Sequence, residues 1–428
     1  MLGSGDEPGP KFIKRLSIEE KTFIIKVHYH TQRKGRSTML NKDYTAKLLG
    51  MEEVKVTNVE RTEKEIRIDI ELPRKDHSCP VCSETTNRIH DYRIQKIKEV
   101  ALGQKTYLYL RKRRYKCLAC GKQFYEENRF LGRYRRMTVR LIQDLITRLR
   151  KLAPASEIAK ACNVSSMTVF RYFDCVRYQC RSLPEVLSID EFKGNAGGEK
   201  YQAITADAKN RKVLDILPNR YEDDLIRYFL RFSSRDNVKY FVTDMNQHFR
   251  RVARICFPKA KIVADRFHVV RQVYWAMENV RKREQKKLSE RFRKYFKRSK
   301  SLLSKPIAKL KEDEKDQLAL MFEISPELAQ AYFLKNRFLE VMQSKGSQEG
   351  RKKLADWLFL AEFQQIPEFG ACITAYRNWS QEILNSLDVP YSNGFTEGCN
   401  NKTKVLKRVC FGVRNFERFR NRILHCSA

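Results

Sequence analysis

The sequence has no apolar run that reaches the ~18 residues a helix needs to cross a bilayer. A secretory signal is not expected either, because Met1 to Pro10 contain glycine and acidic residues but no apolar core. Internal repeats and low-complexity tracts are also missing. We therefore expect a globular, cytoplasmic protein without a membrane partner, whose 12 cysteines act as thiols or metal ligands rather than as disulfides.

Acidic residues are few relative to basic ones. The 428 residues include 86 Lys and Arg against 51 Asp and Glu, a formal charge of +35. Such a surplus destabilises a folded chain by self-repulsion unless a polyanion neutralises it. The surplus favours a nucleic-acid backbone as that polyanion, over the plain alternative of a soluble basic protein.

The length and the changes in pattern predict a multidomain α+β protein. Two alternating apolar runs, Val54–Leu72 and Tyr107–Tyr115, are typical of half-buried strands, and helical periodicity follows from about Met137 to Cys180. The expected divisions are an extension of unclear role (1–38), a ribbon domain (39–130), a helical unit (131–183), a core (184–268), a helical insertion (269–385) and a C-terminal region that completes the core (386–428).

Residues 184–268 predict three strands, then a helix, a strand, a helix, a strand and a long helix. This order is ribonuclease-H-like, and it predicts a mixed sheet covered by helices on both faces. An all-α insertion then separates this core from a last helical region, Phe395–Cys426. In chain order the expected elements are Val186–Phe192, Tyr201–Asp207, Lys212–Leu217, Glu222–Phe232, Lys239–Thr243, Asn246–Cys256, Lys261–Ala264 and a helix from Phe267 to about Ser299.

Two C-x-x-C knuckles are the most specific local motif. Four thiolates at this doubled spacing are typical of one closed, structural zinc site, whereas the alternative is two redox or incidental pairs. The strand-like runs between the knuckles can form a hairpin that brings them together. The predicted zinc ligands are Cys79, Cys82, Cys117 and Cys120, and the basic residues predicted to make this ribbon bind DNA are Arg111, Lys112, Arg113, Arg114 and Lys116.

Residues 155–172 have the pattern of a helix-turn-helix. We expect Ser156 to cap the first helix, Asn163 to form the turn and Ser165 or Ser166 to cap the second helix. Thr168 and Arg171 then face a DNA groove. An ordinary helical hairpin is the alternative.

Carboxylates at the ends of apolar strands are conspicuous in so basic a chain. Asp190 lies in S-I-D-E-F on the first strand of the core, and Asp244 follows the fourth in F-V-T-D-M. Central neighbouring strands would bring these carboxylates to one edge, where hard oxygen ligands suit two magnesium ions. Glu397, between Gly394 and Gly398, is the candidate third acid, whereas Glu191 is expected on the opposite face. The alternative for each acid alone is a strand-end or helix-cap carboxylate.

The chain after Met39 resembles the ISL-three family of bacterial insertion-sequence transposases. The resemblance is based on the doubled C-x-x-C ribbon, the helix-turn-helix and five further segments. These are S-I-D-E-F, V-T-D-M, A-D-R-F-H-V-V, S-N-G-F-T-E-G-C-N-N-K-T-K-V-L-K-R and F-G-V-R-N-F-E-R-F-R-N-R-I-L.

This resemblance implies an enzyme that cleaves and joins DNA strands at the ends of a mobile element. It implies that Asp190, Asp244 and Glu397 form a catalytic triad holding two Mg²⁺ or Mn²⁺ ions, supported by His268 and Asp265 of a D-x-x-H signature. It also implies terminal inverted repeats and target DNA as partners, a homodimer or higher oligomer, and a place in the bacterial nucleoid. Lys402 and Lys404, in the segment that contains Glu397, are further expected DNA contacts.

The helix after His268 is very basic. If Arg281 to Arg298 lie on one long helix, they form a cationic stripe beside the catalytic centre, and Arg291, Arg293 and Lys294 are its expected DNA contacts. A solvated basic face is the alternative. Trp275 is a candidate to stack on a displaced base, although a core position is the preferred interpretation. Two rival functions also remain, a DNA-binding regulator that has lost catalysis and a nuclease that cuts without joining.

Overall fold

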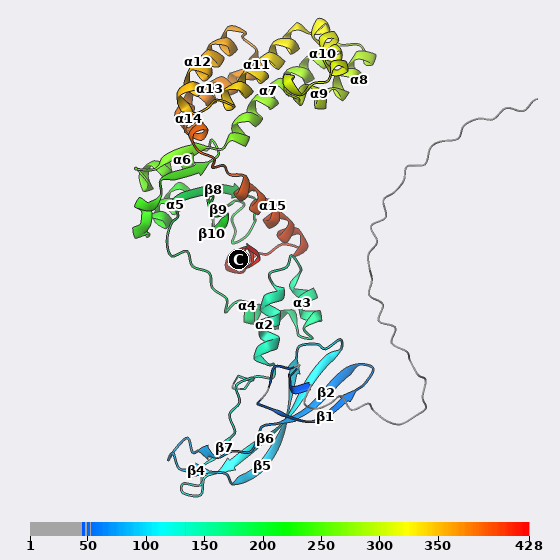
Figure 1. The fold of residues 1–428 in the computed structure, drawn as a ribbon, viewed down its shortest axis with the longest axis vertical. Coiled ribbons are helices and arrows are strands. Elements are labelled where there is room, and N and C mark those ends of the chain that lie inside the picture. The colour runs from blue at the N-terminus through cyan, green and yellow to red at the C-terminus, as the bar shows by residue number, and fades with distance from the viewer. Residues whose placement is uncertain (1–44, 48, 52, 133, 428) are drawn as a thin grey trace, which may run out of the picture.

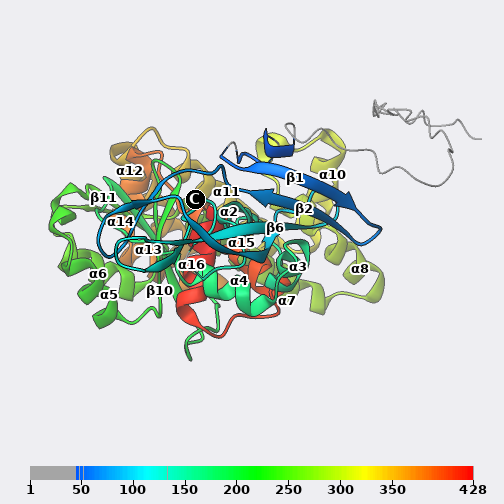
Figure 2. The same ribbon diagram turned by 90° about the horizontal axis from the view of Figure 1, so that it is seen from below.

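The computed structural model describes residues 45–47, 49–51, 53–132 and 134–427, and the expected extension at 1–38 lies outside these residues. The described chain is elongated: an N-terminal sheet lies at one end, a central sheet in the middle and a helical region at the other end (Figure 1). Figure 2, viewed from below, shows strands β1, β2 and β6 crossing in front of the other parts. No helix among the described residues is both long and apolar enough to cross a membrane.

The N-terminal sheet has the strand order β1-β2-β6-β5, with β7 paired to β6. Its strands are β1 (Lys55–Arg61), β2 (Glu65–Glu71), β5 (Ile89–Glu99), β6 (Lys105–Lys116) and β7 (Gln123–Tyr125). The apolar side chains of the two expected alternating runs form its core, including Ile68, Ile70, Leu108 and Leu110. Strands β5 and β6 pair antiparallel, which confirms the expected hairpin between the two cysteine knuckles.

Three short helices follow, α2 (Val139–Arg148), α3 (Ala155–Ala161) and α4 (Ser166–Phe173). The hydroxyl of Ser165 accepts the Thr168 N–H and caps α4, and Asn163 has φ 53° in the turn, both as expected. The expected cap at Ser156 is wrong, because α3 already begins at Ala155, directly after the extended Pro154. The expected helical pattern also ends early, since residues 174–185 form no helix or strand.

The central sheet has the order β10-β9-β8-β11-β12. Its strands are β8 (Val186–Phe192), β9 (Gln202–Asp207), β10 (Lys212–Leu217), β11 (Tyr240–Thr243) and β12 (Lys261–Ala264). The first three pair antiparallel, whereas β8 pairs parallel with β11 and β11 with β12. The sheet is therefore mixed, and the two acid-bearing strands are adjacent at its centre.

Both faces of this sheet are covered, as the sequence predicts. Leu187 and Ile189 point to one face, where they join a core with α5 (Glu222–Leu230) and α6 (Gln247–Cys256). Phe192 and Ile204 point to the other face, where α15 (Gly394–Val409) and α16 (Phe416–Ser427) pack. The C-terminal helices thus complete a layer that starts more than 200 residues earlier in the chain.

The helical insertion has its own apolar core, in which Phe338 stacks on Tyr376 at a centroid distance of 4.6 Å. The expected single helix from Phe267 to about Ser299 is wrong. It is two helices, because Leu288 is extended and packs against the insertion core. The helices are α7 (Arg266–Lys287), α8 (Glu290–Arg298), α9 (Lys300–Ser304), α10 (Glu312–Ile324), α11 (Pro326–Met342), α12 (Ser347–Phe363), α13 (Gly370–Asn378) and α14 (Ser380–Asp388).

Candidate active site

Asp190 and Asp244 lie level with each other on neighbouring strands. Ser188 of β8 is the register partner of Val242 of β11, and each aspartate is two residues further along its chain. Because paired strands are about 4.8 Å apart, the two acids share one edge of the sheet. The structure thus brings together the first two acids that the sequence singles out.

Asp190 is 8% exposed and hydrogen-bonded on both oxygens. Oδ1 accepts the N–H of Glu191 at 2.8 Å, and Oδ2 accepts Nδ2 of Asn400, on α15, at 2.8 Å. Burial raises the pKa of Asp190 to about 6, and the charge of Asp244 raises it further. The negative charge at this position is thus costly without a nearby cation.

Asp244 is in a similar state. Burial, and then the charge of Glu191, raise its pKa, whereas the charge of His268 lowers it. Glu191 itself forms an ion pair with Arg220, in line with its expected place on the other face of β8. Glu191 nevertheless contributes to the negative potential at Asp244.

Asp265 and His268 form a tight pair at the start of α7. Oδ2 of Asp265 contacts Nδ1 of His268 at 2.7 Å and also caps the helix at the His268 N–H. The hydrogen bond that the Asp265 carboxylate accepts from the imidazole raises the pKa of His268. Burial opposes ionisation of Asp265, yet the His268 and Asn393 hydrogen bonds lower its pKa. An imidazolium beside the two aspartates is therefore favoured.

Glu397 lies in the first turn of α15, where its N–H donates to Asn393 O at 2.8 Å. The neighbouring Thr396 hydroxyl contacts Ser188 of β8 at 2.8 Å, so this turn packs directly on the acid-bearing strand. The Glu397 carboxylate has no hydrogen-bond or ion-pair partner among the described residues. Within that part of the chain, Asp190, Asp244 and Glu397 do not form a group whose ligand atoms all lie within 4.8 Å.

Asn393, the N-cap residue of α15, and Asn400, within α15, form hydrogen bonds to the acidic centre. Neither residue was predicted from the sequence. Asn393 donates its N–H to Asp265 Oδ1 at 3.0 Å and its Nδ2 to Ile189 O at 3.0 Å. Oδ1 of Asn393 and Oδ1 of Asn400 are buried and have no donor among the described residues. The available signal was spacing, because Asn393, Glu397 and Asn400 recur at the helical interval of three to four residues.

A cavity of about 340 Å³ opens beside these groups, lined by Asp244, Met245, Asn246, His268, Arg271, Gln272 and Trp275. Trp275 is 56% exposed, so its preferred interpretation as a core residue is wrong. It lies two turns beyond Phe267 on α7, and the Arg271 guanidinium lies 4.7 Å from its ring centroid. Bulky aromatic surface therefore borders the acidic centre.

The four knuckle cysteines converge at the far end of β5 and β6. Their sulfur atoms all lie within 4.8 Å of one another, with Cys79–Cys120 and Cys82–Cys117 separations of 3.5 Å. Zinc–sulfur bonds of about 2.3 Å require sulfur separations of roughly 3.8 Å in a tetrahedron. Backbone N–H groups at Cys82 and Val81 help to lower the pKa of Cys79 to about 6, which favours the thiolate. The residues present fit a structural zinc ion.

The two knuckles are built alike. The Ser83 N–H donates to Cys79 O in one, and the Gly121 N–H donates to Cys117 O in the other. Ser83 and Gly121 occupy the same place with positive φ angles, 60° and 72°. Four ligands are thereby aimed at one point by repeated backbone geometry.

The basic residues of the ribbon differ in accessibility. Arg111 is exposed, and Lys112 and Arg114 are half-buried, with Arg114 paired to Asp91. The expectation for Arg113 is wrong, because it is 7% exposed and donates to Leu72 O and Glu126 inside the domain. On the helical unit, Arg171 is exposed and Thr168 is half-buried.

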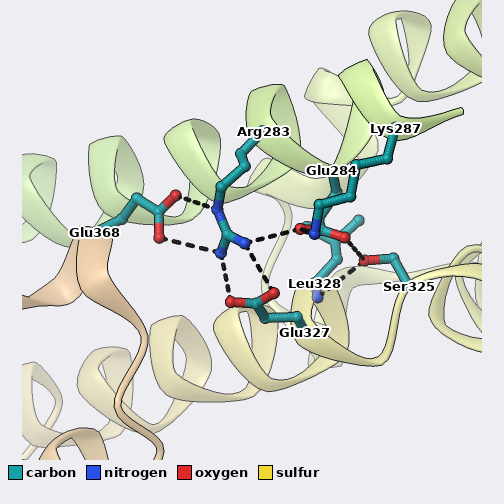
Figure 3. A network of polar contacts seen from close by, with 7 residues as sticks. All are labelled: Arg283, Glu284, Lys287, Ser325, Glu327, Leu328 and Glu368. Carbon is teal, nitrogen blue, oxygen red and sulfur yellow. Dashed lines mark hydrogen bonds and ion pairs between the residues drawn. The ribbon is translucent and has the colours of Figure 1, made fainter.

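The expected cationic stripe is also broken up. Figure 3 shows Arg283 between Glu327 and Glu368, with Glu284 binding both Arg283 and Lys287. Arg281 is 4% exposed and pairs with Glu278. Arg281 and Arg283 thus pair with acids of the insertion and stabilise it, whereas Lys287 stays exposed beside Glu284. Arg291, Arg293 and Lys294 remain exposed on α8, as do Lys402 and Lys404 on α15.

Comparisons with known proteins agree with this arrangement. An ISL3 family model described as a transposase matches residues 187–423, and a model for the zinc finger of the transposases IS204, IS1001, IS1096 and IS1165 matches residues 75–120. The chain is 25% identical over 398 residues to the transposase for insertion sequence element IS1001 of Bordetella parapertussis, covering 89% of this chain and 97% of the relative.

Shorter matches cover about a quarter of the chain. One is the transposase for insertion sequence element IS1557 of Mycobacterium tuberculosis, 32% identical over 106 residues, or 25% of this chain and 24% of the relative. Another is a Lactococcus lactis protein named ATP-dependent protease, 31% identical over 111 residues, or 26% of this chain and 34% of the relative.

The fold, the acidic centre and the matched regions together define a transposase of the Asp-Asp-Glu class. Within that class the chain belongs to the ISL3 family, the one called ISL-three above, because the family model spans more than half of its length.

Proposed function

We propose that this chain is the transposase of an insertion sequence, which binds terminal inverted repeats and catalyses metal-dependent cleavage and transfer of DNA strands. The family membership supports the activity, and the +35 charge supports the substrate class. The observation that contributes most is the level placement of the buried Asp190 and the half-buried Asp244, two acids whose pKa values are raised.

The domain roles form part of this proposal. Residues 39–130 are the DNA-binding zinc ribbon and residues 131–183 a helix-turn-helix. Residues 184–268 and 386–428 are a ribonuclease-H-like core, with 269–385 as its helical insertion. The strand order and directions of the central sheet and the geometry of α3 and α4 support these assignments.

Asp190, Asp244 and Glu397 are the proposed ligands of two Mg²⁺ or Mn²⁺ ions. The buried carboxylate of Asp190, the half-buried one of Asp244, the unpaired one of Glu397 and two buried amide oxygens without donors among the described residues are hard oxygens of the kind that magnesium prefers. When bound, the ions supply an activated nucleophile and stabilise the leaving oxygen of an in-line displacement.

This chain's own residues position the substrate. Asn400 holds the Asp190 carboxylate, and Asp265 occupies Nδ1 of His268, so Nε2 is the ring nitrogen left for the scissile phosphate. Hydrolysis at the element end frees a 3′-hydroxyl. That hydroxyl then displaces a target phosphodiester, so one bond is broken for each bond formed.

The proposed DNA contacts are exposed or half-buried cations and polar side chains on three units. They are Arg111, Lys112 and Arg114 on the ribbon, Thr168 and Arg171 on α4, Arg291, Arg293 and Lys294 on α8, and Lys402 and Lys404 on α15. A homodimer or higher oligomer on DNA, in the bacterial nucleoid, completes the proposal.

A strand-cleavage assay on a labelled inverted-repeat end, with and without Mg²⁺, tests this function. The repeat is identified by sequencing the DNA that flanks the gene. A transposase cuts and joins only with the metal; a regulator binds without cutting, and a nuclease cuts without a joined product. Binding without metal-dependent cleavage would reject the proposal.

A further inference from the structure

Helix α16 packs on the central sheet through one face. Phe419 and Ile423 join the apolar cluster that includes Phe192 and Ile216 of the sheet. Arg420, on the same helix, pairs with the buried Asp215 of β10 at 2.6 Å. This side of α16 is therefore fixed to the layer that contains Asp190.

The other face of α16 holds the α2–α4 unit. The guanidinium of Arg422, which is 6% exposed, donates to Leu149 O, to Lys151 O at 2.9 Å and to Ala153 O at 2.8 Å. These carbonyls follow the end of α2, where a helix leaves its last acceptors unpaired. One arginine thus fixes the turn between α2 and α3.

Two further contacts join α16 to α4 and α2. Arg418 forms two parallel hydrogen bonds of 2.7 Å with Asp174, the C-cap of α4. The His425 ring contacts Ile146 O at 2.7 Å through Nε2 and the Tyr178 hydroxyl at 2.5 Å through Nδ1. In contrast, the direct chain connection from α4 to β8, residues 174–185, has no helix or strand.

We propose that α16 sets the distance between the DNA-reading helices and the carboxylate centre, and so selects which phosphodiester is cut. This inference rests on the proposed function. Arg418, Arg422 and Asp174 are positioning residues, since they act through α16 and lie outside the acidic centre. A displacement of about 1 Å at a reacting centre can cost roughly 10²-fold in rate, so a loosened α16 affects the cut strongly.

The test maps cleavage at nucleotide resolution on a labelled duplex that contains the element's own inverted repeat and flanking DNA. The variants are Arg418→Asp, Asp174→Arg, the double reversal of this pair, and Arg422→Gln. Arg414→Gln is the matched control, because this exposed arginine precedes α16 and its side chain has no hydrogen bond or ion pair with the described residues. End binding and thermal unfolding are measured for each protein.

The single reversals and Arg422→Gln should bind the end, yet cut the normal phosphodiester about 10²-fold more slowly and also cut its neighbours. The double reversal should restore the single wild-type cut, a rescue that general loss of folding does not give. Single reversals that cut at the wild-type position and rate, or a double reversal without rescue, would overturn the inference. A wild-type protein that does not cut would instead reject the proposed function.

Discussion

Acids that are wholly or partly withdrawn from solvent dominate the proposed catalytic residues. Burial raises the pKa of both Asp190 and Asp244, and a neighbouring carboxylate adds to each shift, Asp244 for Asp190 and Glu191 for Asp244. Such an arrangement destabilises the free protein and is relieved when a cation binds. Asn400 holds Asp190 with a single donor, which limits the movement of that carboxylate without neutralising it.

Asp190→Asn, Asp244→Asn and Glu397→Gln should each abolish strand cleavage and leave end binding nearly intact. Each change removes a proposed metal ligand without adding bulk. The two aspartate changes also remove a repelled charge, so thermal unfolding should occur at the wild-type temperature or above. Cleavage assays and melting curves check this, and substantial cleavage by any variant would exclude that residue from the triad.

Lys335 is a second buried charge, in the core of the insertion. It has no exposed surface, donates to Leu303 O at 2.9 Å and Lys305 O at 2.6 Å, and lies 3.9 Å from the Tyr332 ring centroid. Burial lowers its pKa to about 7. Between about pH 7 and the ordinary lysine value near 10.4, the unfolded chain therefore binds more protons than the folded chain.

The stability of the wild-type insertion should accordingly rise with pH across this window relative to Lys335→Met. Below about pH 7 the folded chain must hold a charged, buried Lys335, which lowers its stability by the full amount. As the pH rises towards the ordinary lysine pKa, the unfolded chain loses this proton too, and the loss of stability disappears. Melting temperatures of the full chain at pH 7, 8 and 9 measure the difference, with the exposed Lys309→Met as the control. A difference that stays constant with pH would show that Lys335 keeps its proton in the folded chain and would contradict its lowered pKa.

The sequence predicted which acids lie at the candidate site better than it predicted which side chains are buried or which partners they contact. Asp190 and Asp244 were found because strand-end acids follow apolar runs. Arg113 and Trp275 were misjudged because burial depends on tertiary partners, such as Glu126, that no local pattern reveals. Asn400 was missed for the same reason, since its partner lies 210 residues away.

Among the elements, the zinc ribbon depends most clearly on a ligand. Removal of zinc should unfold residues 75–125, because four converging thiolates repel one another without a cation. Elemental analysis should give about one zinc per wild-type chain and much less for Cys82→Ser. Cys175→Ser, at an exposed cysteine outside the cluster, is the control. A zinc-free protein that keeps this region folded would refute the assignment.

Helix α8 contains the exposed cations of the insertion that we propose as DNA contacts. Reversal of Arg291, Arg293 and Lys294 to glutamate should weaken binding to flanking or target DNA more than binding to the inverted repeat. These cations are exposed, whereas Arg281 pairs with Glu278, and Arg283 pairs with Glu327 and Glu368 (Figure 3 shows the contacts of Arg283). The same reversal at Lys345, Arg351 and Lys352, around the start of α12, is the control, and competition binding measures both. If the affinity for both kinds of DNA falls equally, or does not fall at all, the proposed DNA contact is rejected and the insertion has only a structural role.

The central strands could be predicted almost residue by residue, because fully buried strands are short apolar runs bounded by turns. Helix ends were less predictable. The break at Leu288 has no glycine or proline, and it exists because that side chain packs on the insertion core. The basic run therefore predicted helical structure correctly, but it predicted one continuous helix where the structure has two, α7 and α8.

At the scale of the whole molecule, the +35 charge should make DNA binding strongly salt-dependent. With 6–10 phosphates neutralised together, the affinity should fall by about 10³- to 10⁵-fold between 50 and 200 mM salt. Binding to the inverted repeat measured across this range checks it. A nearly flat dependence would show that the charge serves another purpose.

The contact from Asn400 to Asp190 spans 210 residues of chain. During synthesis at about 5 to 20 residues per second, this separation corresponds to roughly 10 to 40 s. The zinc ligands and the helices α2–α4 all leave the ribosome before Asp190, whereas Glu397, Asn400 and α16 leave it after the insertion. A growing chain therefore has its proposed DNA-binding parts well before its proposed catalytic centre is complete, and we expect a chain interrupted in the insertion to bind DNA without cutting it.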